Sequence, residues 1–302
     1  MNILVTGSSG WLGQTLVPRL ARDGHRVIGL DPEPGATTRA VGSVVDRDLV
    51  RRLIRDNAIE AIVHAAARHK PHIETHDNSE FVAVNVQGTL NLLEEAVAAG
   101  VGCFVFTSTT SLMISQKIRD GKAGGAREAV WIDESMAPLA PRNIYGVTKL
   151  AAEDLCRLFH QQHGLPVVIL RTARFFPEED DMAHAIRQSG ENTKANEFLF
   201  RRLSVEDAAE AHVVALARAP QIGFDTFIVS AMTPFSRQDC RDLIVDAPSV
   251  VARYFPDYRA LYDKRGWTMF KSIDRIYDAS KAARKLGFVC RTDFKEILDG
   301  LR

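Results

Sequence analysis

The sequence has little cysteine, no excess of charge of either sign and no long apolar run. Its 302 residues include 38 basic and 38 acidic side chains, so no global field attracts nucleic acid or an anionic membrane. No segment approaches the roughly 20 apolar residues that span a bilayer. We therefore expect neither a nucleic acid nor a membrane as partner. A hydrophobic content of 46% is enough for a sizeable core.

The four cysteines lie far apart and lack the spacing of metal ligands. They are expected to be buried free thiols in a reducing cytoplasm. The chain enters a strand at residue 2, which leaves no room for a signal or transit peptide, so a cytoplasmic location is predicted. We find no internal repeat and no low-complexity tract.

The first thirteen residues form the most informative motif. A short apolar strand, Ile3 to Val5, leads into Gly7, Gly10 and Gly13, and an amphipathic run follows to Asp23. Glycines at this spacing allow a tight turn, a close approach of backbone to phosphate, and packing of helix on strand. The N–H groups at the helix start face the anion. This corner predicts a dinucleotide site, although glycine-rich turns also occur without ligands.

Strands and helices alternate along most of the chain, which predicts an α/β fold with a doubly wound parallel Rossmann sheet. Strands are expected at 2–6, 26–30, 40–45, 60–64, 101–108, 166–171 and 224–229. Helices are expected at 11–23, 46–56, 78–99, 143–163, 205–218, 237–245 and 278–286. The segments 111–142 and 178–196 are expected to be irregular, the second of them polar and mobile.

Several strand ends carry residues suited to a ligand crevice. Asp31 directly follows the second strand, where an acid accepts hydrogen bonds from the adenosine ribose and repels a 2′-phosphate. This favours NAD over NADP. Ala65 to Ala67 follow the fourth strand and let a flat dinucleotide lie against backbone. The histidines just beyond them are irregularly spaced, so no metal site is predicted.

A tyrosine and a lysine carry the predicted chemistry. Tyr145 and Lys149 are four residues apart, so they project from one helical face. A tyrosine is a poor base near neutral pH, because its ordinary pKa is about 10, but an adjacent ammonium favours the phenolate. Tyr145 is expected to take the proton of a substrate hydroxyl that Thr109 orients, while Lys149 also holds the nicotinamide ribose.

With these motifs the chain resembles the extended short-chain dehydrogenase/reductases of the NAD-dependent epimerase/dehydratase family. The resemblance is specific over residues 1 to about 175 and looser to about residue 230. It implies NAD as cofactor, a small carbohydrate-like substrate, and a homodimer paired through the helices at 78–99 and 143–163. It also implies a Rossmann domain at 1–172 plus about 205–230, and a smaller α/β C-terminal substrate-binding region at 173–204 and 231–302.

The expected site divides into three groups. The catalytic residues are Thr109, Tyr145 and Lys149. The residues expected at the cofactor are Gly7, Ser9, Gly10, Trp11, Leu12, Gly13, Asp31, Ser43, Val44, Ala65, Ala66, Ala67, Asn85, Thr107, Ser108, Tyr145, Lys149 and Ala173. The residues expected at the substrate are His69, Thr110, Arg174, Arg201 and Arg202.

Departures from the family pattern bear on the reaction. Sugar-nucleotide 4,6-dehydratases carry an Asp-Glu pair after the catalytic hydroxyl, where this chain has Thr110 and Ser111, so that elimination is disfavoured. Epimerases often carry an asparagine where Arg174 stands. Their diphosphate-binding arginine aligns best with Phe200, next to Arg201 and Arg202. Ser43 stands where the family has an aspartate near adenine. An insertion at 115–131 is either a lid, a dimer contact or a tolerated surface insertion.

Three functions follow from this reading. The first is an epimerase-type reaction at a carbinol carbon of a sugar or sugar nucleotide, with NAD regenerated in each cycle. The second is net dehydrogenation of a small polar substrate such as a sugar acid, held by Arg174 and the basic segment 68–72. The third is a non-catalytic dinucleotide sensor, against which the presence of Thr109, Tyr145 and Lys149 argues.

Overall fold

The computed structural model describes residues 1–175 and 188–302. These residues fall into two compact units. The first comprises Met1–Leu112, Ala140–Thr172 and Ala208–Phe227, and the second comprises Met113–Leu139, Ala173–Asp207 and Ile228–Arg302. The division differs from the expected domain boundaries mainly in the segment Met113–Leu139, which belongs to the second unit.

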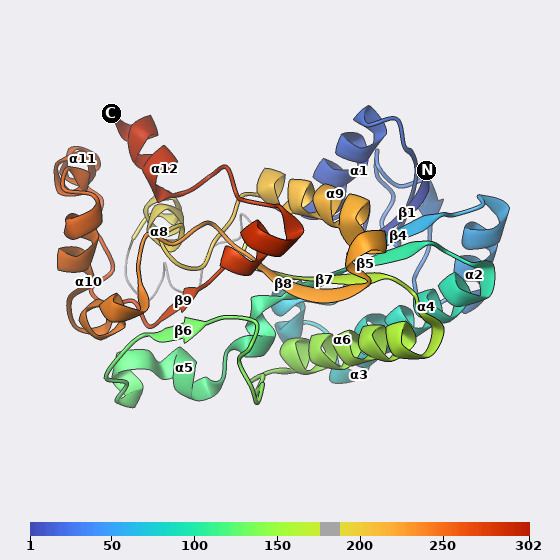
Figure 1. The fold of residues 1–302 in the computed structure, drawn as a ribbon, viewed down its shortest axis with the longest axis horizontal. Helices are drawn as coiled ribbons and strands as arrows, with labels where there is room; N and C mark the ends of the chain where they lie inside the picture. Colours follow the sequence, from blue (N-terminus) through green and yellow to red (C-terminus); the bar gives the residue numbers. More distant parts are fainter. Residues whose placement is uncertain (176–187) are drawn as a thin grey trace. The chain divides into compact units, whose positions relative to one another are not determined.

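A seven-stranded sheet forms the centre of the first unit, in the order β3-β2-β1-β4-β5-β7-β8 (Figure 1). The strands are β1 (Asn2–Thr6), β2 (Arg26–Asp31), β3 (Ala40–Val41), β4 (Ala61–His64), β5 (Cys103–Thr109), β7 (Val167–Thr172) and β8 (Phe224–Val229). The pairs from β3 through to β7 are parallel. The strand order reverses at β1, which has β2 and β4 as neighbours, and ligands of such sheets bind at this point.

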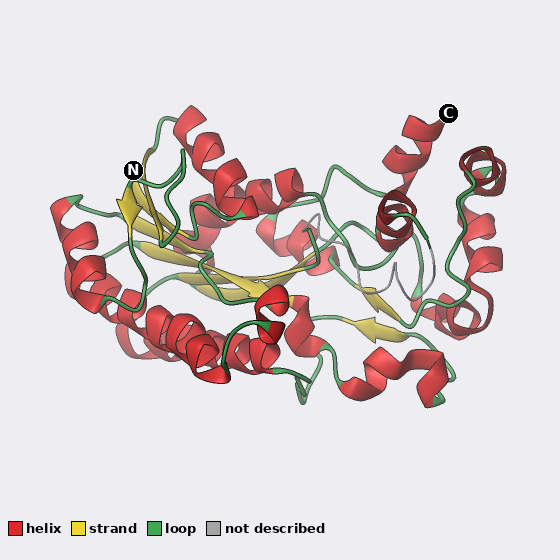
Figure 2. Ribbon diagram, turned by 180° about the vertical axis from the view of Figure 1, so that it is seen from behind, coloured by secondary structure: helices red, strands yellow, loops and turns green. Residues whose placement is uncertain are grey.

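Helices cover both faces of this sheet (Figure 2). One face carries α1 (Trp11–Arg22) and α9 (Val205–Ile222), and the other carries α2 (Arg47–Asp56), α4 (Gly88–Ala99) and α6 (Ile144–His163). Because helices cover both faces, the side chains on both sides of these strands are buried, which suits their apolar sequences. Ile28, Ile62, Phe104 and Ile169 pack with Leu92 of α4 and Ala152 of α6 in one core.

The predicted helix at 78–99 forms in three consecutive pieces. These are α3 (Asn78–Phe81), the π-helical turn η2 (Val82–Gln87) and α4. The turn contains Asn85, which is 1% exposed. Gly100 ends α4 in the left-handed conformation (φ 69°), as predicted from its position.

The second unit combines a small sheet with several helices. Its strands β6 (Val130–Ile132) and β9 (Arg275–Tyr277) pair in parallel. Its helices are α5 (Gln116–Asp120), α8 (Gly190–Glu197), α10 (Cys240–Tyr254), α11 (Tyr258–Arg265) and α12 (Phe294–Leu301). Short helical turns complete both units: η1 (Lys70–Glu74), η3 (Thr110–Met113), η4 (Gly121–Gly124), η5 (Arg237–Asp239) and η6 (Ala282–Leu286).

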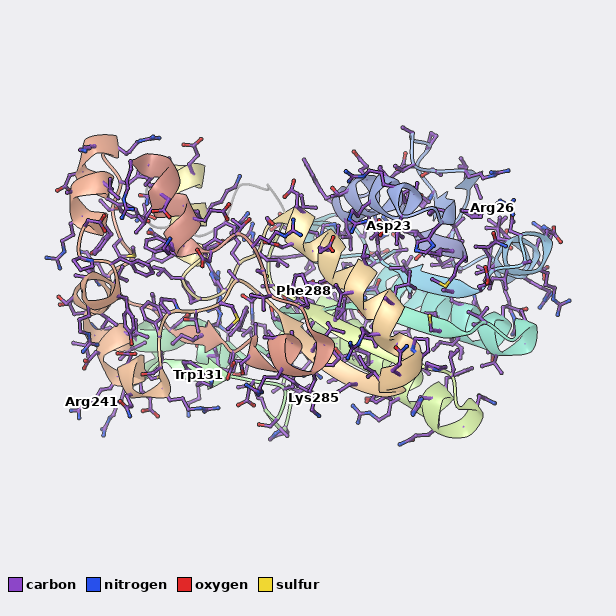
Figure 3. All side chains as sticks on the ribbon, turned by 45° about the horizontal axis from the view of Figure 1, so that its top comes forward. Asp23, Arg26, Trp131, Arg241, Lys285 and Phe288 are labelled. Carbon is purple, nitrogen blue, oxygen red and sulfur yellow. The ribbon has the colours of Figure 1, made fainter. Side chains whose placement is uncertain are left out.

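The core of the second unit is rich in aromatic side chains. Tyr262 contacts Tyr258, Trp267 and Phe294 through ring edges. Trp131 of β6, which is labelled in Figure 3, donates from Nε1 to Asp278 at 3.1 Å. The insertion at 115–131 is built into this unit, because Ala129 N donates to Cys240 O at 2.8 Å and Val130 N to Asp274 O at 2.9 Å. The C-terminal end of the insertion is therefore part of the small sheet, whereas most of residues 116–128 are exposed.

The structure corrects several predicted elements. The third strand spans two residues instead of 40–45, and the segment after it forms the turn that leads to α2. Part of the segment predicted to be irregular and mobile is helix α8, and the rest, 178–187, lies outside the described residues. The final helix is α12 and not the one predicted at 278–286, of which η6 covers the end.

None of the described helices combines the length and the apolar character that a membrane crossing requires. All four cysteines are buried free thiols, as predicted.

Candidate functional site

The glycine turn after β1 has the geometry of an anion cradle. Gly7 adopts φ +75°, and a Cβ there would lie 2.7 Å from Ala66 N. A Cβ at Gly13 would lie 2.3 Å from Gly7 O, whereas one at Gly10 would meet only Gly7 O, at 3.4 Å. Helix α1 starts at Trp11 with Gly10 as its N-cap, and neither a capping side chain nor an acid occupies its first turn. The N-terminal N–H groups of α1 therefore suit a pyrophosphate.

Asp31 ends β2 beside this turn. Its Oδ2 accepts from Ser9 N at 3.0 Å and its Oδ1 accepts from Glu33 N at 2.9 Å. These two bonds fix the carboxylate between the glycine turn and the loop after β2. Such an acid at the end of the second strand fits an adenosine ribose.

A network of hydroxyl groups, which was not predicted, also joins the loop after β2 to the glycine turn. The Thr38 hydroxyl lies 2.6 Å from Ser8 Oγ and 2.7 Å from Ser9 Oγ, and Thr37 Oγ1 donates to Ser8 O at 2.7 Å. Residue 29 of β2 must be a glycine for this loop to pack against it, because a Cβ at Gly29 would lie 2.0 Å from Thr37 O. The pair Thr37-Thr38 following the strand-end acid was the available signal.

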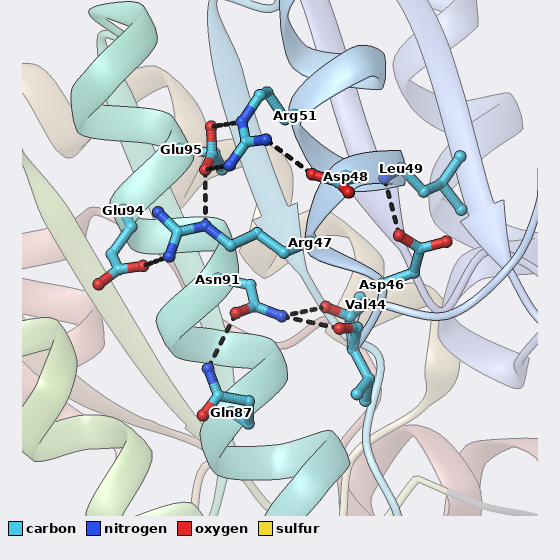
Figure 4. A network of polar contacts seen from close by, with 11 residues as sticks. Val44, Asp46, Arg47, Asp48, Leu49, Arg51, Gln87, Asn91, Glu94 and Glu95 are labelled. Atoms are coloured by element: carbon cyan, nitrogen blue, oxygen red, sulfur yellow. Dashed lines mark hydrogen bonds and ion pairs between the residues drawn. The ribbon is translucent and has the colours of Figure 1, made fainter.

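The turn that holds Ser43 and Val44 is fixed from α4 (Figure 4). Asn91 is 2% exposed, and its Nδ2 donates to Val44 O at 3.0 Å and to Val45 O at 3.1 Å. Its Oδ1 accepts from Gln87 Nε2 at 2.9 Å. One turn later, buried Glu95 binds Arg47 and Arg51 of α2, at 2.8 and 3.0 Å. The candidate adenine contacts therefore have a rigid support.

His64, at the end of β4, belongs to a hydrogen-bond chain with defined direction. Ala66 N donates to Thr6 Oγ1 (3.2 Å), which lies 2.7 Å from His64 Nδ1. On the other side, His64 Nε2 lies 3.0 Å from Thr89 Oγ1, which donates to Asn85 O. Because the Thr89 hydroxyl is already a donor to Asn85, the network assigns the His64 proton to Nε2. Burial, and then the charge of Lys149, hold the His64 pKa well below its ordinary value.

Asn85 connects the alanine segment to helix α6. Its Oδ1 accepts from Arg68 N at 2.8 Å, and its Nδ2 donates to Arg68 O at 2.9 Å and to Thr148 Oγ1 at 3.0 Å. Ala65, Ala66 and Ala67 are half-buried in the segment before Arg68. A π-helical turn at such a position is frequent at functional sites.

The histidines beyond the alanines pack on one another. His69 contacts His72 and His72 contacts His76, with ring centroids 4.6 and 5.0 Å apart. Burial lowers the His69 pKa to about 4, assisted by the charges of His72, Arg68 and Lys149. Among residues 1–175 and 188–302, no group of three or more His, Cys, Asp or Glu could hold a metal ion.

The hydroxyls at the end of β5 point in different directions. Ser108 Oγ donates to Glu153 Oε1 at 2.5 Å, and Thr107 Oγ1 lies 2.7 Å from His212 Nε2. Thr110 Oγ1 donates to Thr172 O at 3.3 Å. Thr109 is 7% exposed, and its Oγ1 accepts from Ser111 N at 3.1 Å, so its own proton stays available. The protein thus engages the Thr107 and Ser108 hydroxyls, which leaves Thr109 as the candidate for substrate.

Helix α6 presents the tyrosine and the lysine. Asn143 caps it by accepting from Gly146 N at 2.9 Å. Tyr145 is half-buried in the first turn, and Lys149 is 2% exposed one turn later. The Lys149 ammonium lies 3.9 Å from the centre of the Phe106 ring, and burial lowers its pKa to about 7.

The remaining predicted residues lie in the second unit. Ala173 is 2% exposed and donates to Val229 O at 2.8 Å. Arg174 pairs with Arg202 through a backbone bridge. Arg201 Nη2 and Arg202 Nη1 each lie 2.5 Å from a carboxylate oxygen of Glu197, which is completely buried. Glu197 was not among the predicted residues, although its i,i+4 spacing to Arg201 was an available signal.

The sheet order, the glycine turn and the acid after β2 define a dinucleotide-binding Rossmann protein. Residues 3–226 match the model of the NAD dependent epimerase/dehydratase family, so the chain belongs to that family. The protein is accordingly an NAD-dependent enzyme of the epimerase/dehydratase type, and the predicted family, fold class and cofactor are confirmed.

Relatives with curated names include sugar-nucleotide enzymes. The chain is 27% identical to dTDP-glucose 4,6-dehydratase of Streptomyces antibioticus, over 98% of this chain and 90% of the relative. It is 32% identical to UDP-glucose 4-epimerase of Rhizobium meliloti, over 56% of this chain and 50% of the relative. The chain thus spans only about half the length of several relatives that it matches.

Solved structures with the same fold cover nearly the whole chain. A short-chain dehydrogenase/reductase superfamily protein from Agrobacterium tumefaciens, with bound NAD, has a TM-score of 0.69 at 23% identity, over 100% of this chain and 96% of that one. UDP-glucose 4-epimerase from Thermotoga maritima, with UDP-glucose, has a TM-score of 0.67 at 20% identity, over 99% and 96%.

Proposed function

We propose that the enzyme oxidises a carbinol carbon of a sugar nucleotide and reduces it again, an epimerase-type reaction. NAD, when bound, supplies the hydride acceptor. The first unit would hold it through the glycine turn, Asp31 and the Lys149 ammonium. The Tyr145 phenolate removes the proton of the substrate hydroxyl, and Thr109 orients that hydroxyl by hydrogen bonding. The same Tyr145 proton returns to the substrate oxygen on reduction.

The buried Lys149 carries this proposal. Burying an ammonium costs several kcal/mol unless an anion pairs with it, and in the described part of the chain Lys149 forms no ion pair. Such an arrangement is typical of a functional group and not of a structural one. A positive charge one helical turn from Tyr145 favours its phenolate.

The names of the relatives support a sugar nucleotide as substrate, since they include UDP-glucose 4-epimerases and dTDP-glucose 4,6-dehydratases. Dehydration is disfavoured for this chain, because Thr110 and Ser111 stand where the 4,6-dehydratases carry an Asp-Glu pair. The enzyme is therefore assigned to the epimerase side of the family.

One observation favours the second candidate, net dehydrogenation of a small polar substrate such as a sugar acid. Arg201 and Arg202, the candidates for holding a substrate diphosphate, both bind the buried carboxylate of Glu197. Phe200 occupies the position that best matches the diphosphate-binding arginine of the epimerases. A substrate without a diphosphate needs neither arginine, and Arg174 then becomes the candidate anchor for its carboxylate.

A substrate screen separates the two reactions. The purified protein is incubated with NAD and with UDP-sugars, dTDP-glucose or sugar acids, and both sugar products and NADH absorbance are followed. Conversion of a sugar nucleotide to its epimer without net NADH supports the epimerase assignment. Steady NADH formation with a sugar acid overturns it in favour of the dehydrogenase.

We also propose a homodimer in the cytoplasm. Helix α6 exposes Val147 (49%) and Leu158 (41%), and η2 exposes Val82 (48%), which supports pairing through these two helices. The four free thiols support a reducing compartment. Sedimentation of the wild type against Val147→Lys tests the pairing: a dimer that the substitution dissociates is expected, and a monomeric wild type contradicts it.

A further inference from the structure

Helix α6 carries a carboxylate at the position where a partner for Lys149 is expected. Glu153 is four residues after Lys149, a spacing at which opposite charges on a helix pair. Both side chains are buried: Glu153 is completely buried and Lys149 is 2% exposed. Among the described residues, however, Lys149 forms no ion pair with any carboxylate. The reason lies in the partners that Glu153 already has.

Arg171 and Ser108 occupy both oxygens of Glu153. Arg171 of β7 donates from Nε to Oε1 at 3.0 Å and from Nη2 to Oε2 at 2.7 Å. Ser108 of β5 donates to Oε1 at 2.5 Å. Arg171 is itself 5% exposed, so this bidentate pair is desolvated and geometrically fixed.

The Lys149 ammonium consequently lies on the ring of Phe106, which precedes Ser108 by two residues on β5. The 3.9 Å separation is that of a cation–π contact. Phe106 also contacts His64 on its neighbour β4, with centroids 5.6 Å apart. The buried cluster of Lys149, Glu153 and Arg171 thus has a net charge of +1, which a Lys149–Glu153 pair alone would not have.

Three other ionisable side chains near Lys149, those of His64, His69 and Cys156, do not change the net charge around it. His64 is neutral near pH 7, because burial, and then the charge of Lys149, hold its pKa well below its ordinary value. His69, on the segment after β4, has its pKa lowered to about 4, and burial raises the pKa of the Cys156 thiol on α6. Both are neutral near pH 7, as is a Tyr145 phenol that keeps its proton. Glu153 and Arg171 therefore decide the net charge around Lys149.

We propose that Arg171 is a positioning residue of the active site: it holds Glu153 away from Lys149, so that the Glu153 carboxylate does not offset the positive charge that the ammonium exerts on Tyr145 and the cofactor. This role rests on the proposed function of the Tyr145–Lys149 pair. The proposed role of Arg171 requires no contact with substrate or cofactor. It acts through the charge of Glu153 alone.

The test is the titration of Lys149 itself in three variants. Protein labelled with ¹³C-lysine gives an ε-carbon signal for Lys149, assigned by its loss in Lys149→Met, and its pH midpoint reports the ammonium. Arg171→Met leaves Glu153 to pair with Lys149, so the midpoint is expected to rise by about one to three pH units. Glu153→Gln keeps one acceptor oxygen for Arg171 and an amide donor for the Ser108 hydroxyl but removes the negative charge, so the midpoint falls.

The double variant Arg171→Met with Glu153→Met removes the ion pair while keeping apolar volume, and a buried pair often tolerates this. Its midpoint is expected within about one unit of the wild type, since the positive charge of Arg171 and the negative charge of Glu153 are removed together. Opposite shifts in the two single variants and restoration in the double one support the proposal. Shifts in the same direction, or none, overturn it in favour of a purely structural ion pair.

The pH profile of turnover provides the second readout. In Arg171→Met the acid limb is expected to move to higher pH, because a Lys149 ammonium paired with Glu153 favours the Tyr145 phenolate less. The titration of Lys149 needs no turnover, so it tests the role of Arg171 even if the proposed reaction is wrong. Moved Lys149 midpoints with an unmoved acid limb would instead contradict the link to Tyr145.

Discussion

The backbone N–H of Ser9 donates to the Asp31 carboxylate at 3.0 Å, which joins the glycine turn to the end of β2. Asp31 also accepts from Glu33 N, so both carboxylate oxygens are held by backbone. The acid that is proposed to select the cofactor is thereby fixed before the cofactor binds. Pre-organisation of this kind favours affinity because little ordering remains to be done.

Replacing Asp31 tests its role in cofactor choice. Asp31→Ser should narrow the preference for NAD over NADP by about tenfold or more, because repulsion between a carboxylate and a 2′-phosphate at about 4 Å is worth roughly 1–4 kcal/mol. Calorimetric titration with both cofactors measures the change. Glu33→Gln, which removes the next carboxylate along the chain, serves as the control. Equal binding of NADP and NAD by the wild type would contradict the role of Asp31.

Two glycines of the same turn should respond differently to alanine. At Gly13 the added Cβ would lie 2.3 Å from Gly7 O, so Gly13→Ala should lower stability by about 1–3 kcal/mol. At Gly10 the nearest atom is 3.4 Å away, so Gly10→Ala should fold like the wild type but bind NAD at least about tenfold more weakly. Thermal unfolding and NAD titration measure both effects. Unchanged NAD affinity in Gly10→Ala would disprove the phosphate contact.

Asn91 offers a test of the adenine end of the site. Asn91→Ala leaves the Val44 and Val45 carbonyls without their buried donor, at a cost of about 1–3 kcal/mol. We expect weaker binding of ADP-ribose and unchanged binding of nicotinamide mononucleotide, since only the Ser43–Val44 turn is loosened. Gln87→Ala removes the outer member of the same network and is the control. Equal losses for both ligands would argue against an adenine contact at this turn.

Buried neutral histidines should make the protein sensitive to acid. His212 donates from Nδ1 to Ala208 O at 2.7 Å, and burial lowers its pKa from 6.5 to about 4. The unfolded state therefore binds more protons between these values, so stability is complete above about pH 6.5 and declines as the pH falls towards 4. At pH 5 His212 alone accounts for roughly 2 kcal/mol.

Urea unfolding at pH 7 and pH 5 measures this dependence. His212→Gln is expected to reduce the difference between the two stabilities by roughly 2 kcal/mol, whereas His163→Gln, at an exposed histidine, should leave it unchanged. The quantity compared is the change in unfolding free energy between pH 7 and pH 5. The absolute stability is not compared, because His212→Gln also alters the contact with Thr107. An unaltered pH dependence in His212→Gln would show that His212 is protonated in the fold.

Local patterns made the glycine turn and the acid at the end of β2 predictable as structural features. Gly7 to Gly13 and Asp31 stand at the junctions of strands with turns, where spacing alone determines geometry. The same holds for Lys149 after Tyr145 on one helix. The family resemblance added Ser43 and Val44, which the sequence spacing alone does not identify.

The remainder depends on contacts between distant parts of the chain. The pairing of Arg171 with Glu153, and the directions of the Thr107 and Ser108 hydroxyls, follow from how α6, α9 and the sheet pack. Strands β6 and β9 are three residues each, too short for a periodic signal. Helix α8 contains polar residues that are buried, such as Asn192 and Asn196, so its composition suggested a loop.

The most direct test of the proposed chemistry is turnover by Tyr145→Phe with the sugar nucleotide found in the substrate screen. Loss of the phenol should reduce turnover by about 100-fold to 10,000-fold, the usual value of a positioned acid–base group, while NAD affinity stays within about twofold because the ring remains. Tyr258→Phe, which removes a hydroxyl bound to Pro248 O in the second unit, should retain full activity. Near-wild-type turnover by Tyr145→Phe would contradict the proposed acid–base role of Tyr145.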